Sequence, residues 1–307
     1  MSLNKAFESK LERFSTWWEN KTKGILLPGL DGLSLYDLWE IYSGGIIKGT
    51  FSTRASAIAF SFFMALFPFL LFMLNLIPYI QFIDDFQLQF LIFMDSLLPP
   101  QTSVFFQDIF LDIANNPRGG LLSVAFILSI FLMTNGVNAI FTGFEFSYHT
   151  NANRSIIRQY IIAVGISLIM ALLLLITVIL AVYLTYALDD LDKLGLIPKD
   201  GIGAQLVKYS AFILLIYIGV ATLYFFGTKE ARKAKFFSIG AFFTTILILI
   251  TTYFFGLYID NFSSYNELYG SIGALLILMV YIWINSNILL LGFELNASLI
   301  KLKRNFN

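Results

Sequence analysis

Residues 160–188 read YIIAVGISLIMALLLLITVILAVYLTYAL, a stretch of 29 residues without a charged side chain. An α-helix rises about 1.5 Å per residue, so about 20 apolar residues cross the hydrocarbon core of a bilayer, which is roughly 30 Å thick. Backbone polar groups find no water there, and a helix satisfies all of them within one segment. The stretch therefore predicts a transmembrane helix and indicates the class of the whole chain.

Composition extends this prediction to all 307 residues. Hydrophobic residues make up 58% of the chain, charged residues 13%, and the mean hydropathy is +0.77, whereas soluble domains average about 25% charged residues. The net charge of +0 provides no broad basic field of the kind that nucleic-acid binding requires. With no cysteine and one histidine, disulfides and thiolate chemistry are excluded and little remains for a zinc site.

Six stretches are apolar and long enough to cross a bilayer, so we predict an all-α polytopic membrane protein. The stretches are residues 55–80, 121–148, 160–188, 209–228, 236–259 and 268–293. They form a predicted six-helix transmembrane domain over residues 51–300. Residues 1–50 precede it, and a short basic tail, residues 301–307, follows it.

Lysine and arginine residues near the ends of these stretches predict the orientation. With the N-terminus inside, eleven of them lie on one side: Lys48, Arg54, Arg154, Arg158, Lys229, Arg232, Lys233, Lys235, Lys301, Lys303 and Arg304. Four lie on the other side: Arg118, Lys193, Lys199 and Lys208. Because basic residues favour the cytoplasmic side of a membrane, both termini are expected in the cytoplasm.

Segments outside the spans also have amphipathic character. In residues 3–18 apolar side chains recur at helical spacing among lysines, which predicts a helix lying on the anionic inner surface. Ser34 and Asp37 have the spacing of a capping box, which predicts a second helix that starts there and ends at Gly44–Gly45. The outer loop, residues 81–118, is apolar and interrupted by a Pro-Pro pair, so we expect it to form interfacial or re-entrant helices.

Charged residues at membrane depth are candidates for function because they are costly in hydrocarbon. Glu145 and Glu294 follow the strings Gly143-Phe144 and Gly292-Phe293, near the predicted cytoplasmic ends of the second and sixth stretches. Arg54 lies at the same level, at the start of the first stretch. The three side chains could form a cytoplasmic gate or a headgroup site. Alternatively, the glutamates reach water or cap their helices.

Amides and one proline within the spans are further candidates. Asn138 and Asn287 each lie seven residues before a glutamate, so each shares a helix face with that glutamate. Together with Asn135, they either line a polar pathway or act as contacts between helices, each contributing on the order of 1 kcal/mol. Pro68 interrupts the first span and predicts a kink, which is either a fixed shape or a hinge.

Three parts of the sequence resemble the YihY/BrkB family of bacterial membrane proteins. They are Arg54-Ala55-Ser56-Ala57-Ile58-Ala59-Phe60 with Leu66-Phe67-Pro68, Asn135-Gly136-Val137-Asn138-Ala139-Ile140 with Gly143-Phe144-Glu145, and Tyr269-Gly270-Ser271-Ile272-Gly273-Ala274 with Leu291-Gly292-Phe293-Glu294-Leu295-Asn296-Ala297. The last is the most specific, and the similarity runs from about residue 35 to the C-terminus. The resemblance implies six spans in a bacterial inner membrane. It also carries the family's label of ribonuclease BN, a tRNA-processing activity, and its associations with serum resistance and lipopolysaccharide-precursor export.

These observations favour a transporter or lipid-translocation protein of the inner membrane. No Walker-type phosphate loop occurs, so the chain is not expected to have its own ATPase. One alternative is a structural or assembly protein without a transport pathway. The other is the tRNA-processing ribonuclease of the family label, for which the sequence provides no cytoplasmic cluster of metal-binding residues. The expected partners are membrane lipids and a lipid or small-molecule substrate, with no nucleic acid, cofactor or metal, and a homo-oligomer remains open.

Overall fold

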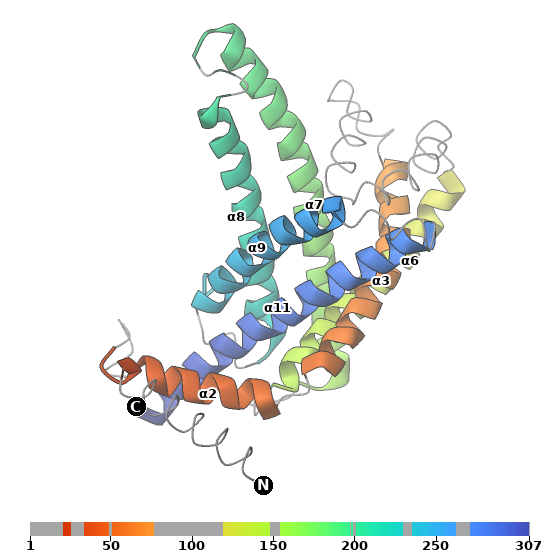
Figure 1. Ribbon diagram of the computed structural model, residues 1–307. Helices are drawn as coiled ribbons and strands as arrows, with labels where there is room; N and C mark the ends of the chain where they lie inside the picture. Colours follow the sequence, from red (N-terminus) through yellow and green to blue (C-terminus); the bar gives the residue numbers. More distant parts are fainter. Residues whose placement is uncertain are drawn as a thin grey trace.

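A computed structural model of the chain describes residues 21–25, 34–48, 51–76, 119–147, 154–196, 198, 201–229, 235–261 and 271–306. Within these ranges the fold is built from helices, which confirms the predicted all-α class (Figure 1). The helices are α2 (Leu35–Lys48), α3 (Phe51–Leu76), α6 (Gly119–Glu145), α7 (Ile156–Lys193), α8 (Ile202–Gly227), α9 (Ile239–Asn261) and α11 (Ser271–Phe306). The helix expected in residues 3–18 and the outer loop 81–118 lie outside the described residues.

Helix α11 has contacts with α2, α3 and α9, so it joins several parts of the bundle. In Figure 1, α3 and α6 lie side by side, and α7 and α8 form an antiparallel pair that extends away from the other helices. Helix α2 lies across one end of the bundle, beside the last turns of α11. We call this end, where α6 ends at Glu145 and α7 begins, the glutamate end.

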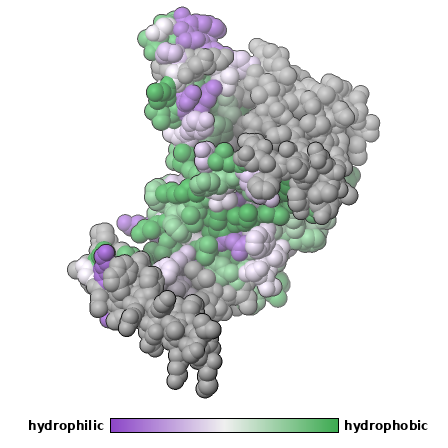
Figure 2. Space-filling view, viewed as in Figure 1, coloured by the Kyte–Doolittle hydropathy of each residue, from purple (hydrophilic) through white to green (hydrophobic). Residues whose placement is uncertain are grey.

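The surface of the molecule is that of a membrane protein. Among the described residues, five helices are long and apolar enough to cross a bilayer, over Phe126–Glu145, Ile156–Lys193, Ile202–Gly227, Ile239–Tyr258 and Leu275–Lys301. Helix α3 adds a shorter apolar stretch, Phe51–Leu66. In Figure 2 hydrophobic residues fill the middle of the visible face, and hydrophilic residues gather toward its ends. The polytopic membrane class is thus confirmed, while the count of six spans and the side of the termini remain predictions.

Helix α2 begins as the sequence predicts and ends later. The Ser34 hydroxyl donates to the Asp37 carboxylate at 2.6 Å, and the Asp37 backbone N–H donates back to Ser34 Oγ at 3.3 Å. These bonds form the expected capping box and hold the pKa of Asp37 below its usual value. The predicted end at Gly44–Gly45 is wrong, because α2 continues to Lys48. Its packing on α11, where the Tyr42 hydroxyl donates to the carbonyl of Leu291, outweighs the low helix propensity of glycine.

Helix α11 extends beyond the predicted sixth span. That span was expected over residues 268–293, and the helix continues to Phe306, into the predicted basic tail at residues 301–307. The added turns are held by packing, since the four residues Asn296, Ala297, Ser298 and Leu299 are all buried. Asn296 accepts a hydrogen bond from the Gly240 backbone N–H at 2.8 Å, at the start of α9. Glu294 therefore lies inside a helix and does not cap one.

Candidate functional site

The two Gly-Phe-Glu segments of the sequence meet in space. The rings of Phe144 on α6 and Phe293 on α11 are stacked, with centroids 4.1 Å apart and planes 7° apart. Tyr224 of α8 contacts both rings edge-on, at centroid distances of 5.5 and 5.8 Å. All three side chains are buried. Since each phenylalanine directly precedes a glutamate, the stack brings Glu145 and Glu294 to the same end of the bundle.

The glycines of these segments allow the helices to come close together. A Cβ at Gly143 would lie 3.1 Å from the Ile58 side chain of α3 and 3.2 Å from the Leu290 side chain of α11. A Cβ at Gly292 would overlap the Thr244 hydroxyl of α9 and lie 2.6 Å from the Tyr224 hydroxyl. The same Tyr224 hydroxyl donates to a backbone carbonyl of α11 at 2.6 Å. Close packing therefore fixes the positions of α3, α6, α9 and α11 around the glutamates.

Glu294 is fully buried, with 1% of its surface exposed. Its Oε2 accepts a hydrogen bond from the Ser147 hydroxyl at 2.7 Å, so a residue just beyond the end of α6 contacts the middle of α11. The alternative expectation, in which this glutamate simply reaches water or caps a helix, is wrong for Glu294. A carboxylate at such depth requires compensation from nearby donors and charges.

Arg54 of α3 is the second buried charge, with 8% of its surface exposed. Its Nη1 donates to the carbonyl of Gly143 at 2.7 Å, and its guanidinium carbon lies 4.6 Å from the centroid of the Phe51 ring. The negative charge of Glu294 acts on this guanidinium, but the two side chains do not form a direct ion pair. The structure thus places the buried cation Arg54 near the buried anion Glu294, with no direct ion pair between the two side chains.

Tyr42 brings helix α2 to the same place. Its hydroxyl donates to the carbonyl of Leu291, one turn before Glu294, at 3.3 Å. Burial and, to a smaller extent, the charge of Glu294 raise the pKa of Tyr42 to about 12. Sequence reasoning does not single out Tyr42 or Ser147, because nothing in the local pattern shows that either packs on a helix about 150 or more residues away.

Glu145 has a different environment from Glu294, because it is partly exposed and ends α6. It accepts a hydrogen bond from the Arg154 backbone N–H at 3.2 Å. With the amide nitrogen of Gln159 facing it, both carboxylate oxygens also accept hydrogen bonds, at 2.8 and 3.1 Å. The Gln159 oxygen then accepts from the Thr142 hydroxyl at 3.0 Å. Glu145 therefore organises the connection between α6 and α7.

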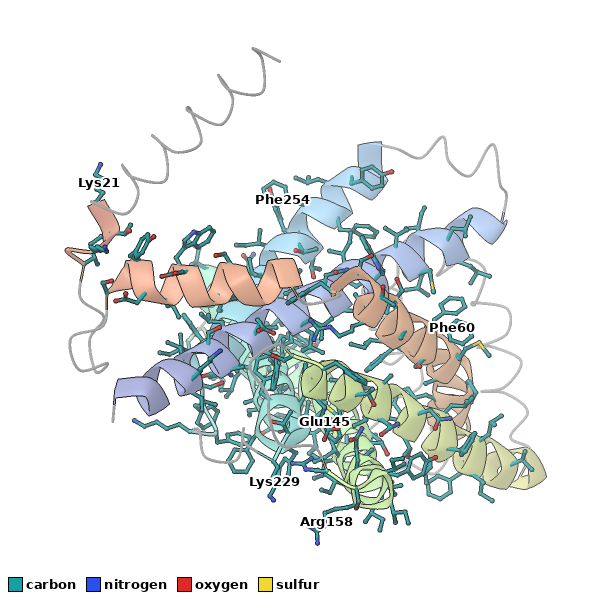
Figure 3. The ribbon with its side chains drawn as sticks, turned by 90° about the horizontal axis from the view of Figure 1, so that it is seen from below. Lys21, Phe60, Glu145, Arg158, Lys229 and Phe254 are labelled. Atoms are coloured by element: carbon teal, nitrogen blue, oxygen red, sulfur yellow. The ribbon has the colours of Figure 1, made fainter. Side chains whose placement is uncertain are left out.

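The view from the glutamate end shows how the charges are distributed (Figure 3). Glu145 lies inside the outline of the helices, whereas Arg158 and Lys229 point outward at the periphery. Arg154 turns inward, where its Nη1 donates to the carbonyl of Phe226 in the last turn of α8 at 2.7 Å. This bond satisfies a carbonyl at a helix C-terminus, a place that favours a cation.

The asparagines connect to different partners. Asn138 lies 3.0 Å from the Gln159 amide, and Asn135 accepts a hydrogen bond from the Tyr160 hydroxyl at 3.3 Å, so both face α7. Asn287 instead donates to the carbonyl of Trp283 in its own helix at 2.8 Å. In these contacts, the face of α6 with Asn138 and Glu145 and the face of α11 with Asn287 and Glu294 do not point toward each other.

Pro68 lies inside α3, fourteen residues after Arg54. That separation corresponds to about 21 Å along a helix. Its carbonyl accepts a hydrogen bond from the Ser129 hydroxyl of α6 at 2.5 Å, which attaches this part of α3 to its neighbour. The structure thus brings together Arg54, Glu294 and, at the same end, Glu145, but it places Pro68 and Asn287 apart from them. In the part of the chain that the structure describes, no three His, Asp or Glu side chains are grouped so that they could hold a metal ion.

Comparison with known proteins gives the family. The family described as Virulence factor BrkB matches residues 45–305. A ribonuclease-like protein, YfkH, of Bacillus subtilis (strain 168) is 28% identical over 260 residues, which cover 82% of this chain and 91% of the relative. A UPF0761 membrane protein of Glaesserella parasuis serovar 5 (strain SH0165) is 21% identical over 207 residues, or 67% of this chain and 71% of the relative.

Another UPF0761 membrane protein, from Actinobacillus pleuropneumoniae serotype 5b (strain L20), is 24% identical over 213 residues, or 69% of this chain and 74% of the relative. No solved structure matches the chain. The family match covers residues 45–305 and includes α3, α6 and α11, the helices that carry Arg54, Glu145 and Glu294. The protein therefore belongs to the Virulence factor BrkB family and is a membrane protein with several apolar helices.

Proposed function

We propose that this protein moves a lipid or another envelope component across the bacterial inner membrane without hydrolysing ATP itself. The observation that carries the proposal is the pair of buried, opposite charges, Arg54 and Glu294, which interact electrostatically at the same end of the bundle. Ionisable groups at membrane depth are expensive, and such groups often mark the path of a substrate or an ion.

In this proposal Arg54 and Glu294 form the gate at the glutamate end, and Glu145 controls the position of α7 beside it. Helix α2 covers the gate through Tyr42 and its contact with Leu291. The asparagines are given a structural role, because Asn135 accepts a hydrogen bond from Tyr160 of α7 and Asn138 lies against Gln159 of the same helix. The proposed gate therefore contains fewer residues than the set of polar candidates that the sequence indicates.

The glutamate end faces the cytoplasm in this proposal. The exposed residues Arg158 and Lys229 lie next to this end (Figure 3), and exposed Lys235 shortly precedes the start of α9, whereas Asp190 and Asp192, with Lys193 paired to Asp190, lie at the far end of α7. Basic residues favour the cytoplasmic side of the membrane, so this distribution supports the orientation.

A vesicle assay tests the translocation activity. Purified protein is reconstituted into liposomes that contain a fluorescent lipid, and a reductant outside the vesicles bleaches only lipid that reaches the outer leaflet. We expect wild-type protein to expose the inner-leaflet lipid, and Glu294→Gln to slow this by about tenfold or more, which corresponds to about 1.4 kcal/mol of barrier. Glu40→Gln is the matched control, because Glu40 is exposed on α2. Equal rates for Glu294→Gln and wild type, with both folded, would contradict the gate.

A second candidate function is a structural or assembly role in the membrane. The observation that favours it is the set of side-chain bonds between α6 and α7, in which Asn135 bonds to Tyr160 and Asn138 lies against Gln159. Such amides are common contacts between packed transmembrane helices. This candidate predicts that vesicles with wild-type protein bleach no faster than protein-free vesicles for every lipid class tested.

The name of the Bacillus subtilis relative leads to one further assay. Purified protein incubated with tRNA and divalent metal ions is expected to release no cleavage products. Cleavage that is lost when Glu145 and Glu294 are both replaced by glutamine would instead support a ribonuclease. The vesicle and tRNA assays share no substrate. Together they therefore distinguish translocation, a structural role and ribonuclease activity from one another.

A further inference from the structure

The guanidinium of Arg54 is held in a fixed orientation. Its Nη1 donates to the Gly143 carbonyl at 2.7 Å, and its guanidinium carbon lies over the Phe51 ring, 4.6 Å from the ring centroid. The two contacts come from different helices, α6 and α3. Together they leave one edge of the group, formed by Nε and Nη2, without a role in the packing.

This edge is buried and has no acceptor among the described residues. Both Nε and Nη2 are inaccessible to solvent and make no hydrogen bond. Leaving charged donors unsatisfied in the interior is costly, so such a group calls for a partner outside the chain. Two parallel N–H groups on one guanidinium edge match two oxygens of a phosphate or carboxylate.

The depth of Arg54 points to phosphate. The charge-free stretch of α3 begins at the next residue, Ala55, so the guanidinium lies at the boundary where hydrocarbon begins. In a bilayer this is the level of the lipid phosphates, and acyl chains lie beside the following turns. Phe60, Phe62 and Met64 on these turns are exposed apolar side chains. A ligand with a phosphate head and acyl chains fits both features.

Glu294 limits the charge of the ligand. Its carboxylate lowers the positive potential around Arg54, so one negative charge on a ligand already balances the guanidinium and a second charge would face Glu294. A phosphodiester carries one negative charge, whereas a phosphomonoester carries close to two near neutral pH. The site should therefore prefer a diester.

We propose that the Nε–Nη2 edge of Arg54, which is closed off in this structure, binds the phosphodiester of a lipid headgroup when the gate at the glutamate end opens. This inference rests on the proposed function, since it names the chemical class of the substrate that the gate would take. It goes beyond that function by assigning recognition to one edge of one side chain, and by predicting selection between lipid classes according to charge.

Native mass spectrometry of the full chain in detergent tests the inference. The probes are phosphatidylglycerol, phosphatidic acid, a phosphate-free diglucosyl lipid and inorganic phosphate. We expect phosphatidylglycerol to be retained best, and Arg54→Lys, which keeps the charge but loses the two-point edge, to weaken its binding by about tenfold or more. Arg158→Lys is the matched control, because Arg158 is exposed at the same end, and it should bind like wild type. Equal binding by Arg54→Lys and wild type would overturn the proposal, as would a preference for inorganic phosphate.

A measurement on the wild-type protein alone covers the case in which Arg54→Lys fails to fold. Phosphatidylglycerol should raise the melting temperature in detergent, and the diglucosyl lipid should not; equal shifts would overturn the proposal. Binding is measured without translocation, so the two ideas fail separately. Intact binding with inactive vesicles contradicts only the proposed function. Active vesicles with unchanged lipid binding in Arg54→Lys contradict only the headgroup site.

Discussion

At the scale of single residues, Gly292 has no space for a side chain. The atoms around its missing Cβ are the Thr244 hydroxyl, the Tyr224 hydroxyl and the Gly240 carbonyl, which come from two other helices. Tyr224 and Thr244 are also 2.6 Å apart and bond to each other, so they cannot easily move away. The identity of residue 292 therefore controls how α8, α9 and α11 fit together just before Glu294.

Gly292→Ala should destabilise the protein by about 1–3 kcal/mol, because an added methyl group must displace buried, hydrogen-bonded side chains. Thermal unfolding in detergent measures the loss. Gly256→Ala is the control, since a Cβ at Gly256 on α9 would have no atom within 4 Å among the described residues. It should unfold at the wild-type temperature or slightly above. Similar melting temperatures for both variants would show that the packing at Gly292 is loose.

The burial of Tyr42 predicts that the stability of the folded protein depends on pH. Burial, and then the charge of Glu294, raise its pKa to about 12, whereas a tyrosine in an unfolded chain ionises near pH 10. The folded state therefore keeps a proton that the unfolded state loses, and this contribution to stability is complete below about pH 10 and lost as the pH rises toward 12.

The difference in tyrosinate absorbance between wild type and Tyr42→Phe isolates this group. Its midpoint is expected near pH 12, and Glu294→Gln should move the midpoint down, because the neighbouring charge is one of its causes. A midpoint that stays near the value of free tyrosine would contradict the burial of Tyr42 against α11.

At the scale of helices, the sequence predicts where apolar helices lie but not all of their ends. The apolar run of residues 121–148 corresponds to α6, Gly119–Glu145, because hydrocarbon depth alone determines such a segment. The ends of α2 and α11 depend instead on tertiary contacts such as Asn296 with Gly240, which no local pattern shows. The candidate site follows the same rule, since Arg54 and Glu294 can be predicted from their cost in hydrocarbon, whereas Ser147 and Gln159 cannot.

Asn296 shows how one side chain connects two helices. Its oxygen accepts from the Gly240 N–H at 2.8 Å, and its nitrogen donates to the Ser238 hydroxyl at 2.7 Å, which caps the start of α9. Asn296→Ala should cost about 1–3 kcal/mol and increase hydrogen exchange in the first turn of α9. Ser298→Ala is the control, because the buried Ser298 hydroxyl has no hydrogen-bond partner among the described residues. Unchanged exchange in Asn296→Ala would mean that α9 is capped without it.

At the scale of the whole molecule, the absence of cysteine makes the orientation directly testable. Asp190, at the far end of α7, and Lys229, beyond the end of α8, are both exposed. In intact cells Asp190→Cys should react with a membrane-impermeant maleimide, and Lys229→Cys should react only after the membrane is opened. The reverse pattern would place the glutamate end outside and remove the cytoplasmic gate.

The length of α7 is another property of the whole molecule. Its 38 residues correspond to about 57 Å, which exceeds the roughly 30 Å of a hydrocarbon core. The helix must therefore tilt, extend beyond the bilayer, or both. The sequence shows this from the distance between Arg158 and Asp189, but the choice between tilt and extension depends on packing against α6 and α8.

The stack of Phe144 on Phe293 has a consequence for how related sequences can change. A Cβ at Gly227 of α8 would lie 2.5 Å from the Phe144 ring, so these three positions fill one shared volume. A larger residue at 227 can be accommodated only if the residue at 144 becomes smaller, and the loss of one ring leaves the other without its partner. Among family members we expect side-chain sizes at 144, 227 and 293 to covary, although the three positions lie on different helices and far apart along the chain.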